Sequence, residues 1–476
     1  MIGPSLPFDI ERRFGLDARA LVSALEAALA TGGDFAEAFL EYREYRSAFM
    51  EEDILKDTSE SFSLGLGLRV WSGETTGYGY TNDLSPDKIL RTARSAAAVA
   101  ASGRAFPAAR LVPRPGGADV YRVERPPDKA PFEAKIALVR AAYEACRGFS
   151  PLIEKVKASI QDQIQYVAIA NSEGLLAADV RPLVRLTCVG IAQRNGLRES
   201  GYSGGGGRVG LEHFEGSASP EAIGREAARE AVDLLDARDA PAGVMPVVLA
   251  AGHAGVLIHE AVGHLLEADF NRRKTSIFWN KAGKKVGTPE VTIYDDPTIP
   301  ASRGSYAIDD EGTIPRKTLL IEKGVVRGLL QDKLSAKLMG RTLTGHGRRQ
   351  DYTDYPIPRM ANTYIDRGEH DPAEIIRSVR KGLYAERFTG GQVEDSGQFT
   401  FSVSSGRLIE EGRLTAPVKQ ATLVGSNVDI LRKIEMVGSD LAFGLPTGTC
   451  SKEGQDVPVN DGCPTLKISA MTVGGK

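Results

Sequence analysis

The strict alternation of apolar with small or polar residues over positions 62–70 constrains the fold more than any other pattern in this chain. The apolar positions are Phe62, Leu64, Leu66, Leu68 and Val70. Because successive side chains of a β-strand point to opposite faces of its sheet, this period of two predicts a strand with one apolar face. Residues 72–74 then predict a turn and residues 76–80 a returning strand, so we expect an antiparallel hairpin here.

Helical periodicity and further strands surround this hairpin. Helices are predicted over residues 17–31, 85–101, 132–147, 219–235 and 253–267, and near 333–339, 372–382 and 425–434. Strands are predicted from 152 to about 200, with a break at 171–174, and at 247–250. The polar, turn-rich segment 236–243 predicts a domain boundary near residue 240.

We therefore expect an α+β protein of two domains. Residues 1–240 are expected to form an N-terminal α/β domain with a mostly antiparallel sheet. Residues 241–476 are expected to form a β-rich C-terminal domain that carries the helix over 253–267. A chain of 476 residues is long enough to bury such cores without disulfide bonds.

The composition excludes several classes of protein. Lys and Arg total 59 and Asp and Glu total 62, so the net charge of −3 gives no electrostatic case for a direct nucleic-acid partner. The four cysteines have no C-x-x-C spacing, which excludes a disulfide scaffold and a zinc ribbon. The most apolar run, residues 245–266, contains three His and one Glu, so no membrane span is predicted. The first residues show no signal-peptide pattern, and we expect a cytoplasmic protein.

Three of the six histidines lie within residues 253–264, in a segment that contains His259-Glu260-Ala-Val-Gly263-His264. In an α-helix, residues five apart are rotated by about 140° relative to each other, so their side chains do not converge. The pattern is therefore either accidental or marks a place where the helix loosens by one residue in a π-bulge, or ends. Gly263 would make local unwinding easy.

A histidine followed by an acid, with a second histidine one turn later, is costly to bury in an apolar helix without a metal. The spacing alone leaves a metal site and an accidental pattern both open. In a metal site, His259 and His264 would be neutral nitrogen ligands of Zn²⁺, and Glu260 would take a proton from metal-bound water. For either histidine alone, a hydrogen-bonded core residue is the commoner interpretation. The spacing favours Glu267 as third ligand and leaves open Asp269, His346, His370, Cys450 and Cys463.

The stretch His259-Glu-Ala-Val-Gly-His264-Leu-Leu-Glu-Ala-Asp269, together with Gly-Thr-Cys450-Ser-Lys-Glu-Gly-Gln-Asp-Val-Pro-Val, resembles the TldD branch of the TldD/PmbA (TldE) metalloprotease family. Residues 348–352 and 358–364 and the closing Thr472-Val-Gly-Gly are also similar to that family. The resemblance covers essentially the whole chain, including its two halves. It implies that zinc is held by His259, His264 and Cys450, with Glu260 as general base. On this resemblance Cys450 outranks Glu267 as third ligand, and Cys463 is a buried or incidental thiol.

The resemblance also implies a function and partners. The chain is expected to be a zinc-dependent metallopeptidase that hydrolyses unfolded or flexible peptides. The peptide is expected to bind as an added strand, in a cavity enclosed by a homodimer or by a heterodimer with a TldE/PmbA-like subunit. The alternative is a non-catalytic regulator of the same family, of the DNA gyrase modulator type. The intact His-Glu-His-Cys set disfavours this alternative.

Three further segments carry weaker signals. Residues 201–210 are rich in glycine but lack the ending of a phosphate loop, and a flexible loop or turn, such as one moving over the cavity, is expected. Residues 309–312 (Asp-Asp-Glu-Gly) lack the acid spacing of a calcium loop, and a solvated turn is expected. The segment 348–359 is interpreted as a surface loop or a substrate-facing one, and its candidate substrate contacts are Arg349, Tyr352 and Arg359.

Overall fold

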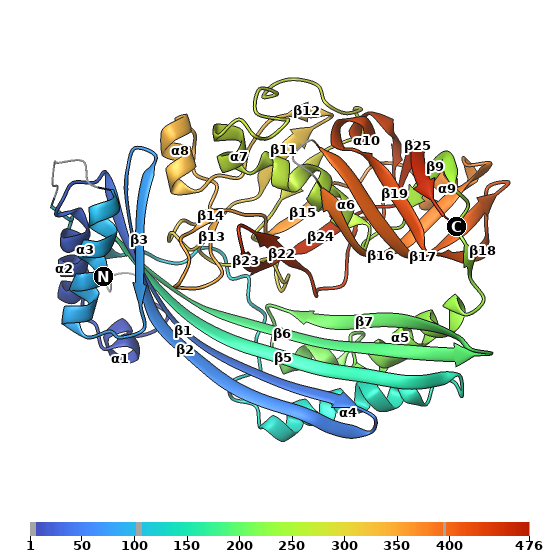
Figure 1. Cartoon of the computed structure of the whole chain (residues 1–476), viewed down its shortest axis with the longest axis horizontal. Coiled ribbons are helices and arrows are strands. Elements are labelled where there is room, and N and C mark those ends of the chain that lie inside the picture. Colours follow the sequence, from blue (N-terminus) through green and yellow to red (C-terminus); the bar gives the residue numbers. More distant parts are fainter. Residues whose placement is uncertain (1–5, 101–106, 394–396, 476) are drawn as a thin grey trace.

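The computed structural model describes residues 6–100, 107–393 and 397–475. The N-terminal half forms a long, curved sheet that carries helices on one face, while the C-terminal half lies against the other face (Figure 1). Helices and strands are mixed in both halves, which confirms the expected α+β class. No helix within the described residues is long and apolar enough to cross a membrane.

In chain order the N-terminal half contains α1 (Ile10–Phe14), α2 (Ala18–Leu29), β1 (Phe35–Glu51), β2 (Ile54–Ser72), β3 (Thr75–Thr81), α3 (Pro86–Val99), β4 (Val112–Pro113), α4 (Phe132–Arg147), β5 (Ile153–Asn171), β6 (Leu175–Arg194), β7 (Leu197–Gly207), the 3₁₀ turn η1 (Leu211–Glu215) and α5 (Pro220–Leu234). The sheet has the strand order β3-β2-β1-β5-β6-β4, with β7 also paired to β6. All of these pairs are antiparallel except β4 with β6.

The hairpin predicted from the alternation is present as β2 and β3. Leu66, Leu68 and Val70 are buried against α2 and α3, whereas Phe62, nearer the far end of β2, is exposed. The C-terminal half covers part of the other face of β2 and buries Arg69 there. Helices α4 and α5 cover the same face of the sheet farther along.

The glycine-rich segment 201–210 is not a flexible loop, contrary to the expectation from sequence. Its residues 201–207 belong to β7, which pairs antiparallel with β6. A Cβ at Gly201 would lie 2.2 Å from the carbonyl oxygen of Ala227 in α5, and one at Gly207 would lie 2.4 Å from that of Ala301. The glycines are therefore needed because this strand passes close to the backbone of α5 and of the C-terminal half.

The elements of the C-terminal half are β8 (Arg238–Asp239), β9 (Gly243–Leu249), α6 (Gly255–Ile258), the π turn η2 (His259–Gly263), the 3₁₀ turn η3 (His264–Leu266), α7 (Ala268–Arg272), β10 (Ile293–Asp295), β11 (Thr318–Glu322), β12 (Val325–Val326), α8 (Lys333–Met339), β13 (Gly347–Arg348), β14 (Ile357–Pro358), β15 (Asn362–Ile365), α9 (Pro372–Arg377), β16 (Lys381–Val393), β17 (Gln398–Glu410), β18 (Arg413–Lys419), β19 (Ala421–Ser426), α10 (Asn427–Lys433), β20 (Ile434–Val437), β21 (Ala442–Phe443), β22 (Thr449–Lys452), β23 (Gln455–Pro458), β24 (Asn460–Cys463) and β25 (Leu466–Gly474). The helix expected over 372–382 ends at Arg377, and β16 begins at Lys381.

These strands form two main sheets. One has the order β16-β9-β25-β19-β17-β18-β8, with β20 against β25, and the other has the order β12-β11-β10-β15-β24-β21. The largest apolar core of the described residues includes side chains of both sheets and of α6, among them Leu257 and Ile258. The helical segment around His259 is thus held in the core of the C-terminal half. The division of the chain at residue 240 stays a prediction.

A network of buried charges joins the two halves. Arg69 of β2 lies 2.9 Å from a carboxylate oxygen of Glu37 in β1 and 2.5 Å from one of Glu311 in the C-terminal half. Arg349 forms a further ion pair with Glu37, and all four side chains are buried. Residues 309–312 therefore lie at a buried junction, and the expected solvated turn is wrong. Such ionisable groups are tolerated away from water because each has hydrogen-bond or ion-pair partners.

Replacing Glu311 by glutamine is expected to flatten the pH dependence of stability. Burial raises the pKa of Glu311 from 4.5 to about 8, so between these values the folded chain holds a proton that the unfolded chain has released. The stability that Glu311 itself contributes is therefore fully present below pH 4.5 and falls as pH rises through this window, by on the order of 1 kcal/mol per pH unit at most. Thermal unfolding midpoints at pH 6, 7 and 8 measure the slope. Equal slopes for the native and Glu311→Gln chains would contradict this assignment.

Candidate metal centre

After α6 the helical segment loosens into the π turn His259–Gly263, and a 3₁₀ turn follows. The N–H of His264 donates to the carbonyl oxygen of His259, five residues earlier. This wider turn brings the two imidazoles together, with their ring centroids 5.1 Å apart. The π-bulge, one of the alternatives that the spacing leaves open, is therefore confirmed.

Gly263 serves this turn through packing. Its φ of −56° and ψ of −58° are ordinary helical values, so the backbone there does not need the conformational freedom of glycine. A Cβ at this position would lie 1.9 Å from the Sδ atom of Met360. From the sequence, we expected glycine at this position because it makes local unwinding easy. The structure gives a different reason, which is the close approach of the Met360 side chain.

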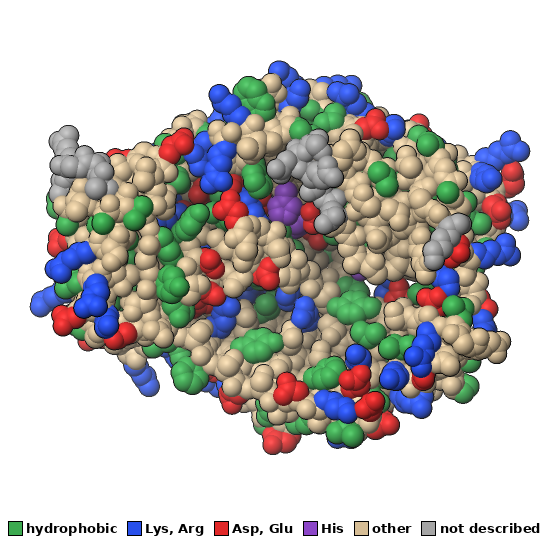
Figure 2. Space-filling model, in the orientation of Figure 1, with side chains coloured by type: hydrophobic (Ala, Val, Ile, Leu, Met, Phe, Trp, Pro, Cys, Tyr) green, Lys and Arg blue, Asp and Glu red, His purple; other side chains and the backbone are tan. Residues whose placement is uncertain are grey.

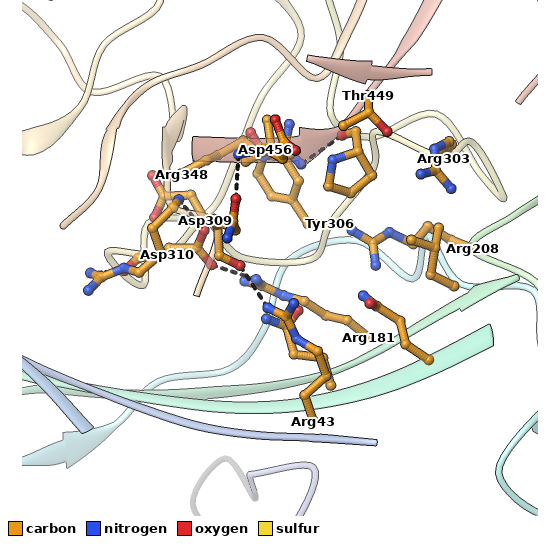
Figure 3. Close-up of a pocket in the computed structure, with 17 residues that line it drawn as sticks. Arg43, Arg181, Arg208, Arg303, Tyr306, Asp309, Asp310, Arg348, Thr449 and Asp456 are labelled. Atoms are coloured by element: carbon orange, nitrogen blue, oxygen red, sulfur yellow. Dashed lines mark hydrogen bonds and ion pairs between the residues drawn. The ribbon is translucent and has the colours of Figure 1, made fainter. Parts of the chain in front are cut away.

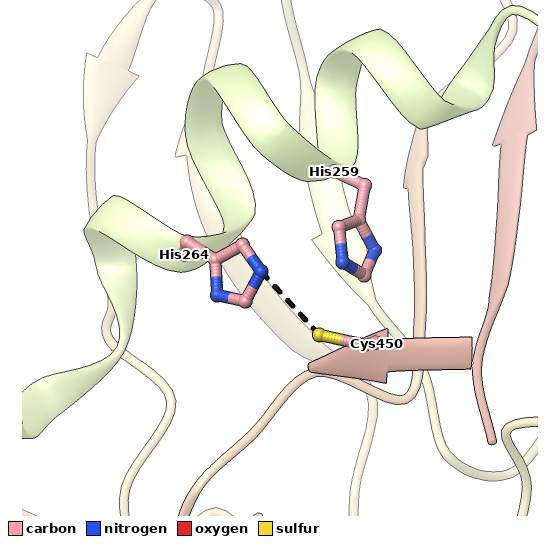
Figure 4. A group of neighbouring side chains, drawn as sticks. All are labelled: His259, His264 and Cys450. Atoms are coloured by element: carbon pink, nitrogen blue, oxygen red, sulfur yellow. Dashed lines mark hydrogen bonds between the residues drawn. The ribbon is translucent and has the colours of Figure 1, made fainter. Parts of the chain in front are cut away.

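Cys450 joins the two histidines from a distant part of the chain (Figure 4). It lies on β22, and its Sγ is 3.3 Å from Nε2 of His264. One ring nitrogen of each histidine and the Cys450 Sγ all lie within 4.8 Å of one another. Nitrogen and sulfur ligands of a tetrahedral Zn²⁺ are separated by roughly 3.5 Å. The donor set therefore fits a tetrahedral ion with two nitrogens and one sulfur, which leaves one coordination position for a water molecule or substrate.

The electrostatics of this cluster favour a bound cation. Although burial alone raises the pKa of the Cys450 thiol, the neighbouring His259 and His264 hold it well below its usual value. Although burial alone lowers the pKa of His264, Glu267 and Cys450 raise it to about 10. A thiolate between two imidazoles is therefore favoured by neighbouring positive charge, which a bound metal ion would supply.

Each histidine is also held by a carboxylate on its other ring nitrogen. Nδ1 of His259 lies 2.7 Å from Oδ1 of Asp461, and Nδ1 of His264 lies 3.1 Å from Oε2 of Glu267. Both rings then present Nε2 toward Cys450. Carboxylates placed in this way fix the orientation and tautomer of metal-binding histidines.

Glu267 thus contacts His264 from outside the cluster, and it is not the third member that its spacing favoured. It also lies 3.0 Å from Nζ of Lys452. Although burial alone raises the pKa of Glu267, Lys452 and His264 lower it to about 2. Lys452 binds Asp269 at 2.8 Å as well, so this lysine ties β22 to the helical segment and holds Cys450 near the histidines.

The remaining candidate ligands lie elsewhere. Cys463 is fully buried, and its Sγ donates to a main-chain carbonyl. His346 is buried beside Asp295, and His370 is half-buried on another part of the surface. Among the described residues, the group able to hold a metal ion consists of His259, His264 and Cys450.

Glu260 lies beside this group and partly faces solvent. One of its carboxylate oxygens is 3.9 Å from Nε2 of His264, and its side chain is 26% exposed. Burial raises the pKa of Glu260. Figure 2 shows histidine, in purple, within a hollow near the middle of this face of the molecule. The carboxylate is therefore placed to reach a water molecule that enters from solvent.

The segment 348–359 contacts the β22–β23 hairpin that carries Cys450. It is not a surface loop, because its arginines are buried. Arg359 donates to the carbonyl oxygens of Cys450 and Gln455 at 2.6 and 3.0 Å, so it positions the β22–β23 hairpin. Arg349 belongs to the buried network between the halves, and the ring of Tyr352 packs against β2. Substrate contact by these three residues stays a prediction.

Asp461 and Lys452 are supporting residues that the sequence did not identify. Asp461 is 202 residues away from His259, and no local pattern marks it. Lys452 lies two residues after Cys450, and this closeness in the sequence is the signal that could have identified it as a supporting residue. Their roles depend on which distant segments the fold brings together.

Replacing Asp461 by asparagine is expected to weaken metal binding by roughly 10–100-fold, because Asn orients the His259 ring without the negative charge. Competition against a chelator of known affinity measures this change. Asp429→Asn is the matched control, because Asp429 is exposed and binds Lys433 on α10. Equal affinities of the Asp461→Asn and native chains would contradict the positioning role.

Sequence models of the PmbA/TldA metallopeptidase domains match residues 36–100 (domain 1), 125–235 (central domain) and 242–475 (C-terminal domain). The chain belongs to the PmbA/TldD metallopeptidase family. It is 42% identical to a metalloprotease TldD homologue of Haemophilus influenzae, over 93% of each chain. It is 32% identical to a zinc metalloprotease TldD homologue of Saccharolobus solfataricus, over 49% of this chain and 52% of the other. As a member of this family, it is an enzyme of the protease class.

A solved structure of the same fold comes from Thermotoga maritima. It matches with a TM-score of 0.77 and 22% identity, over 92% of this chain and 96% of that one. That protein is described as a modulator of DNA gyrase, and identity at this level establishes the shared PmbA/TldD fold alone. Membership of the family implies a resident metal, and the three-residue group described above has the donors to hold one.

Proposed function

We propose that this PmbA/TldD family member is a zinc-dependent metallopeptidase that cleaves peptide bonds in unfolded or flexible peptides. The observation that carries the proposal is the convergence of His259, His264 and Cys450 within 4.8 Å, from positions up to 191 residues apart in sequence numbering, with Glu260 alongside. A structural role alone would not require two imidazoles and a thiolate to face one another in the interior.

The residues present fit zinc better than other common metals. Two imidazole nitrogens and one thiolate are a set that zinc accepts, whereas magnesium and calcium prefer oxygen ligands. Bound zinc would supply Lewis-acid polarisation of the scissile carbonyl and activation of water. His259, His264 and Cys450 would hold it, and Asp461 and Glu267 would fix the two rings.

Glu260 is proposed as the general base. Its carboxylate takes a proton from the attacking water and later gives it to the nitrogen of the departing amine. This carboxylate lies 3.9 Å from Nε2 of His264 and is partly exposed, so it is close to the proposed ligands without being one of them. Arg359 holds the β22–β23 hairpin in place during these steps, and Lys452 ties this hairpin to the helical segment.

The test is cleavage of an unstructured peptide mixture by the purified chain, with and without a chelator, read by mass spectrometry. We expect new peptide ends that vanish with the chelator and return when zinc is added. Absence of cleavage by a zinc-loaded chain would overturn the proposal for the chain alone. Pairing with a second copy or with a TldE/PmbA-like subunit is part of the proposal. Repeating the assay with such a subunit tests whether pairing is needed for cleavage.

A further inference from the structure

A cavity of about 470 Å³ lies in the C-terminal half and, within the described residues, shares no lining residue with the metal centre. Its walls come from α7, β11, β12 and α8 and from the segment that carries Phe278 and Trp279. Sites for small molecules in proteins typically measure roughly 300–1,000 Å³. The cavity is therefore large enough for a small molecule, and its lining shows which chemistry such a molecule needs.

Two buried amide side chains of this cavity have carbonyl oxygens that accept no hydrogen bond. Asn271 and Gln331 both line the cavity and are only 5% and 3% exposed. Within the described part of the chain, Oδ1 of Asn271 and Oε1 of Gln331 have no hydrogen-bond partner. A buried polar atom without a partner is costly, so both oxygens favour a ligand that carries hydrogen-bond donors.

The two amides differ in how freely they can turn. Nδ2 of Asn271 donates to the main-chain carbonyls of Leu265 and Glu267 at 2.8 and 2.9 Å, which fixes the amide oxygen as an acceptor. Nε2 of Gln331 makes a weak contact, at 4.0 Å, with Sδ of Met339. Gln331 can therefore turn to present its oxygen or its nitrogen, whereas Asn271 presents an acceptor alone.

The lining is positively charged, and the described residues that form it include no Asp or Glu. Arg327 of the lining pairs with Glu322 outside it at 2.9 Å. Arg316 and Arg341 are exposed and form no ion pair in the described part of the chain. A guanidinium group offers a planar fork of donors that matches a phosphate or carboxylate, so these two arginines favour an anionic ligand.

Figure 3 shows a different cavity, of about 160 Å³, whose lining contains both arginines and aspartates. There Arg181 pairs with Asp310 at 2.5 Å, so the chain supplies counter-charge for part of that lining. The 470 Å³ cavity has no such acidic residue among the described residues of its lining, so an anion there has to come from a ligand.

The rest of the wall is apolar and partly aromatic. Phe278 and Val326 belong to the main core of the C-terminal half, and Leu329 packs against that core. Trp279 is 48% exposed, so its ring is available to a molecule that enters from solvent. Such a wall favours a ligand with an aromatic ring. Inorganic phosphate has no ring, and a fatty acid has no N–H donor for Asn271.

We propose that this cavity binds an adenine nucleotide, of which adenosine monophosphate is the simplest. The exocyclic amine of adenine has two hydrogens, one for Oδ1 of Asn271 and one for Oε1 of Gln331. The ring packs against the apolar wall, and the phosphate binds Arg316 and Arg341. A peptide would need two separate N–H groups for the same two oxygens. The site lies outside the metal centre, so the inference does not depend on the peptidase function.

Calorimetry with the full chain and three ligands tests the proposal: adenosine monophosphate, inosine monophosphate and adenosine. Inosine monophosphate has a carbonyl oxygen in place of the amine, and adenosine lacks the phosphate. We expect adenosine monophosphate to bind about tenfold more tightly than either of the other two, as the loss of a hydrogen bond to a buried or charged group implies. Equal affinities for the two monophosphates, or no binding of adenosine monophosphate at about 1 mM, would overturn the proposal.

Gln331→Leu removes one of the two amides at nearly constant volume. The preference for adenosine monophosphate over inosine monophosphate is expected to fall to about twofold or less, because one acceptor of the amine is gone. The thermal unfolding midpoint should stay at or above the native value, because Oε1 of Gln331 has no hydrogen-bond partner in the described chain. An undiminished preference in a folded Gln331→Leu chain would overturn the assignment of the amine.

The phosphate contact is tested on exposed residues, whose replacement leaves the core intact. A chain with both Arg316→Gln and Arg341→Gln is expected to bind adenosine monophosphate within about twofold of adenosine. Arg380→Gln is the matched control, because Arg380 is exposed and does not line the cavity. A tenfold preference for the phosphate form that persists in the double variant would overturn the assignment of the phosphate.

Tryptophan fluorescence locates the bound nucleotide. The chain has two tryptophans, of which Trp71 is 2% exposed in the N-terminal half and Trp279 lines the cavity. Adenosine monophosphate is expected to quench part of the emission of the native chain and to leave that of the Trp279→Phe chain unchanged. Quenching that persists in the Trp279→Phe chain would place the nucleotide elsewhere and overturn the proposal.

Discussion

The Glu260→Gln chain is expected to bind metal like the native chain and to cleave peptides at a rate reduced by about 10²–10⁴-fold. Glutamine keeps the size of the side chain but cannot take a proton from water at neutral pH. The proposed ligand atoms belong to His259, His264 and Cys450, so their arrangement does not depend on the Glu260 carboxylate. Initial rates at saturating peptide, together with metal content by elemental analysis, measure both quantities.

Glu453→Gln is the matched control for this substitution. Glu453 lies on the turn between β22 and β23, where it binds Arg273 at 3.2 Å and faces solvent. This control chain is expected to retain the native rate. A Glu260→Gln chain that cleaves peptides at the native rate would contradict the general-base role, and one that loses metal would assign Glu260 to metal binding.

Removal of Cys450 or His264 is expected to abolish both metal binding and cleavage. Loss of a carboxylate that merely supports a ligand costs metal affinity about 10–100-fold, so loss of a ligand itself is expected to cost more than about a hundredfold. The Cys450→Ala and His264→Ala chains should therefore contain little zinc after dialysis and produce no new peptide ends. Elemental analysis and the mass-spectrometric cleavage assay measure the two effects.

Cys463→Ala provides the control for the cysteine substitution. Cys463 is also buried in the C-terminal half, but its Sγ donates to a main-chain carbonyl and is not part of the cluster. This chain should keep its zinc and its activity. Native zinc content in the Cys450→Ala chain would show that the thiolate is not a ligand.

Local patterns in the sequence predicted the elements whose formation depends on residues close together in the chain. The alternation over 62–70 predicted the β2–β3 hairpin, and helical periodicity predicted α4 within its observed bounds, Phe132–Arg147. The five-residue spacing of His259 and His264 restricted the segment to a few geometries, of which the π turn is the one observed. Recognition of Cys450 needed the resemblance to a family, because no local spacing relates it to the histidines.

Features that depend on tertiary contact were not predictable in this way. The glycines of residues 201–207 suggest a loop by composition, but close approach to α5 and to the C-terminal half makes them part of a strand. Glu311 follows two aspartates and precedes a glycine, which is typical of a solvated turn, yet Arg69 from the other half pairs with it in the interior. Asp461 is identified as a supporting carboxylate because β24 brings it to His259.

The most direct test of the central claim is the zinc content of the purified chain, combined with alkylation of Cys450. We expect about one zinc ion per chain and a Cys450 thiol that resists alkylation until a chelator is added, because a metal-bound thiolate is not free to react. Zinc well below one ion per chain, with Cys450 alkylated equally with and without chelator, would contradict it.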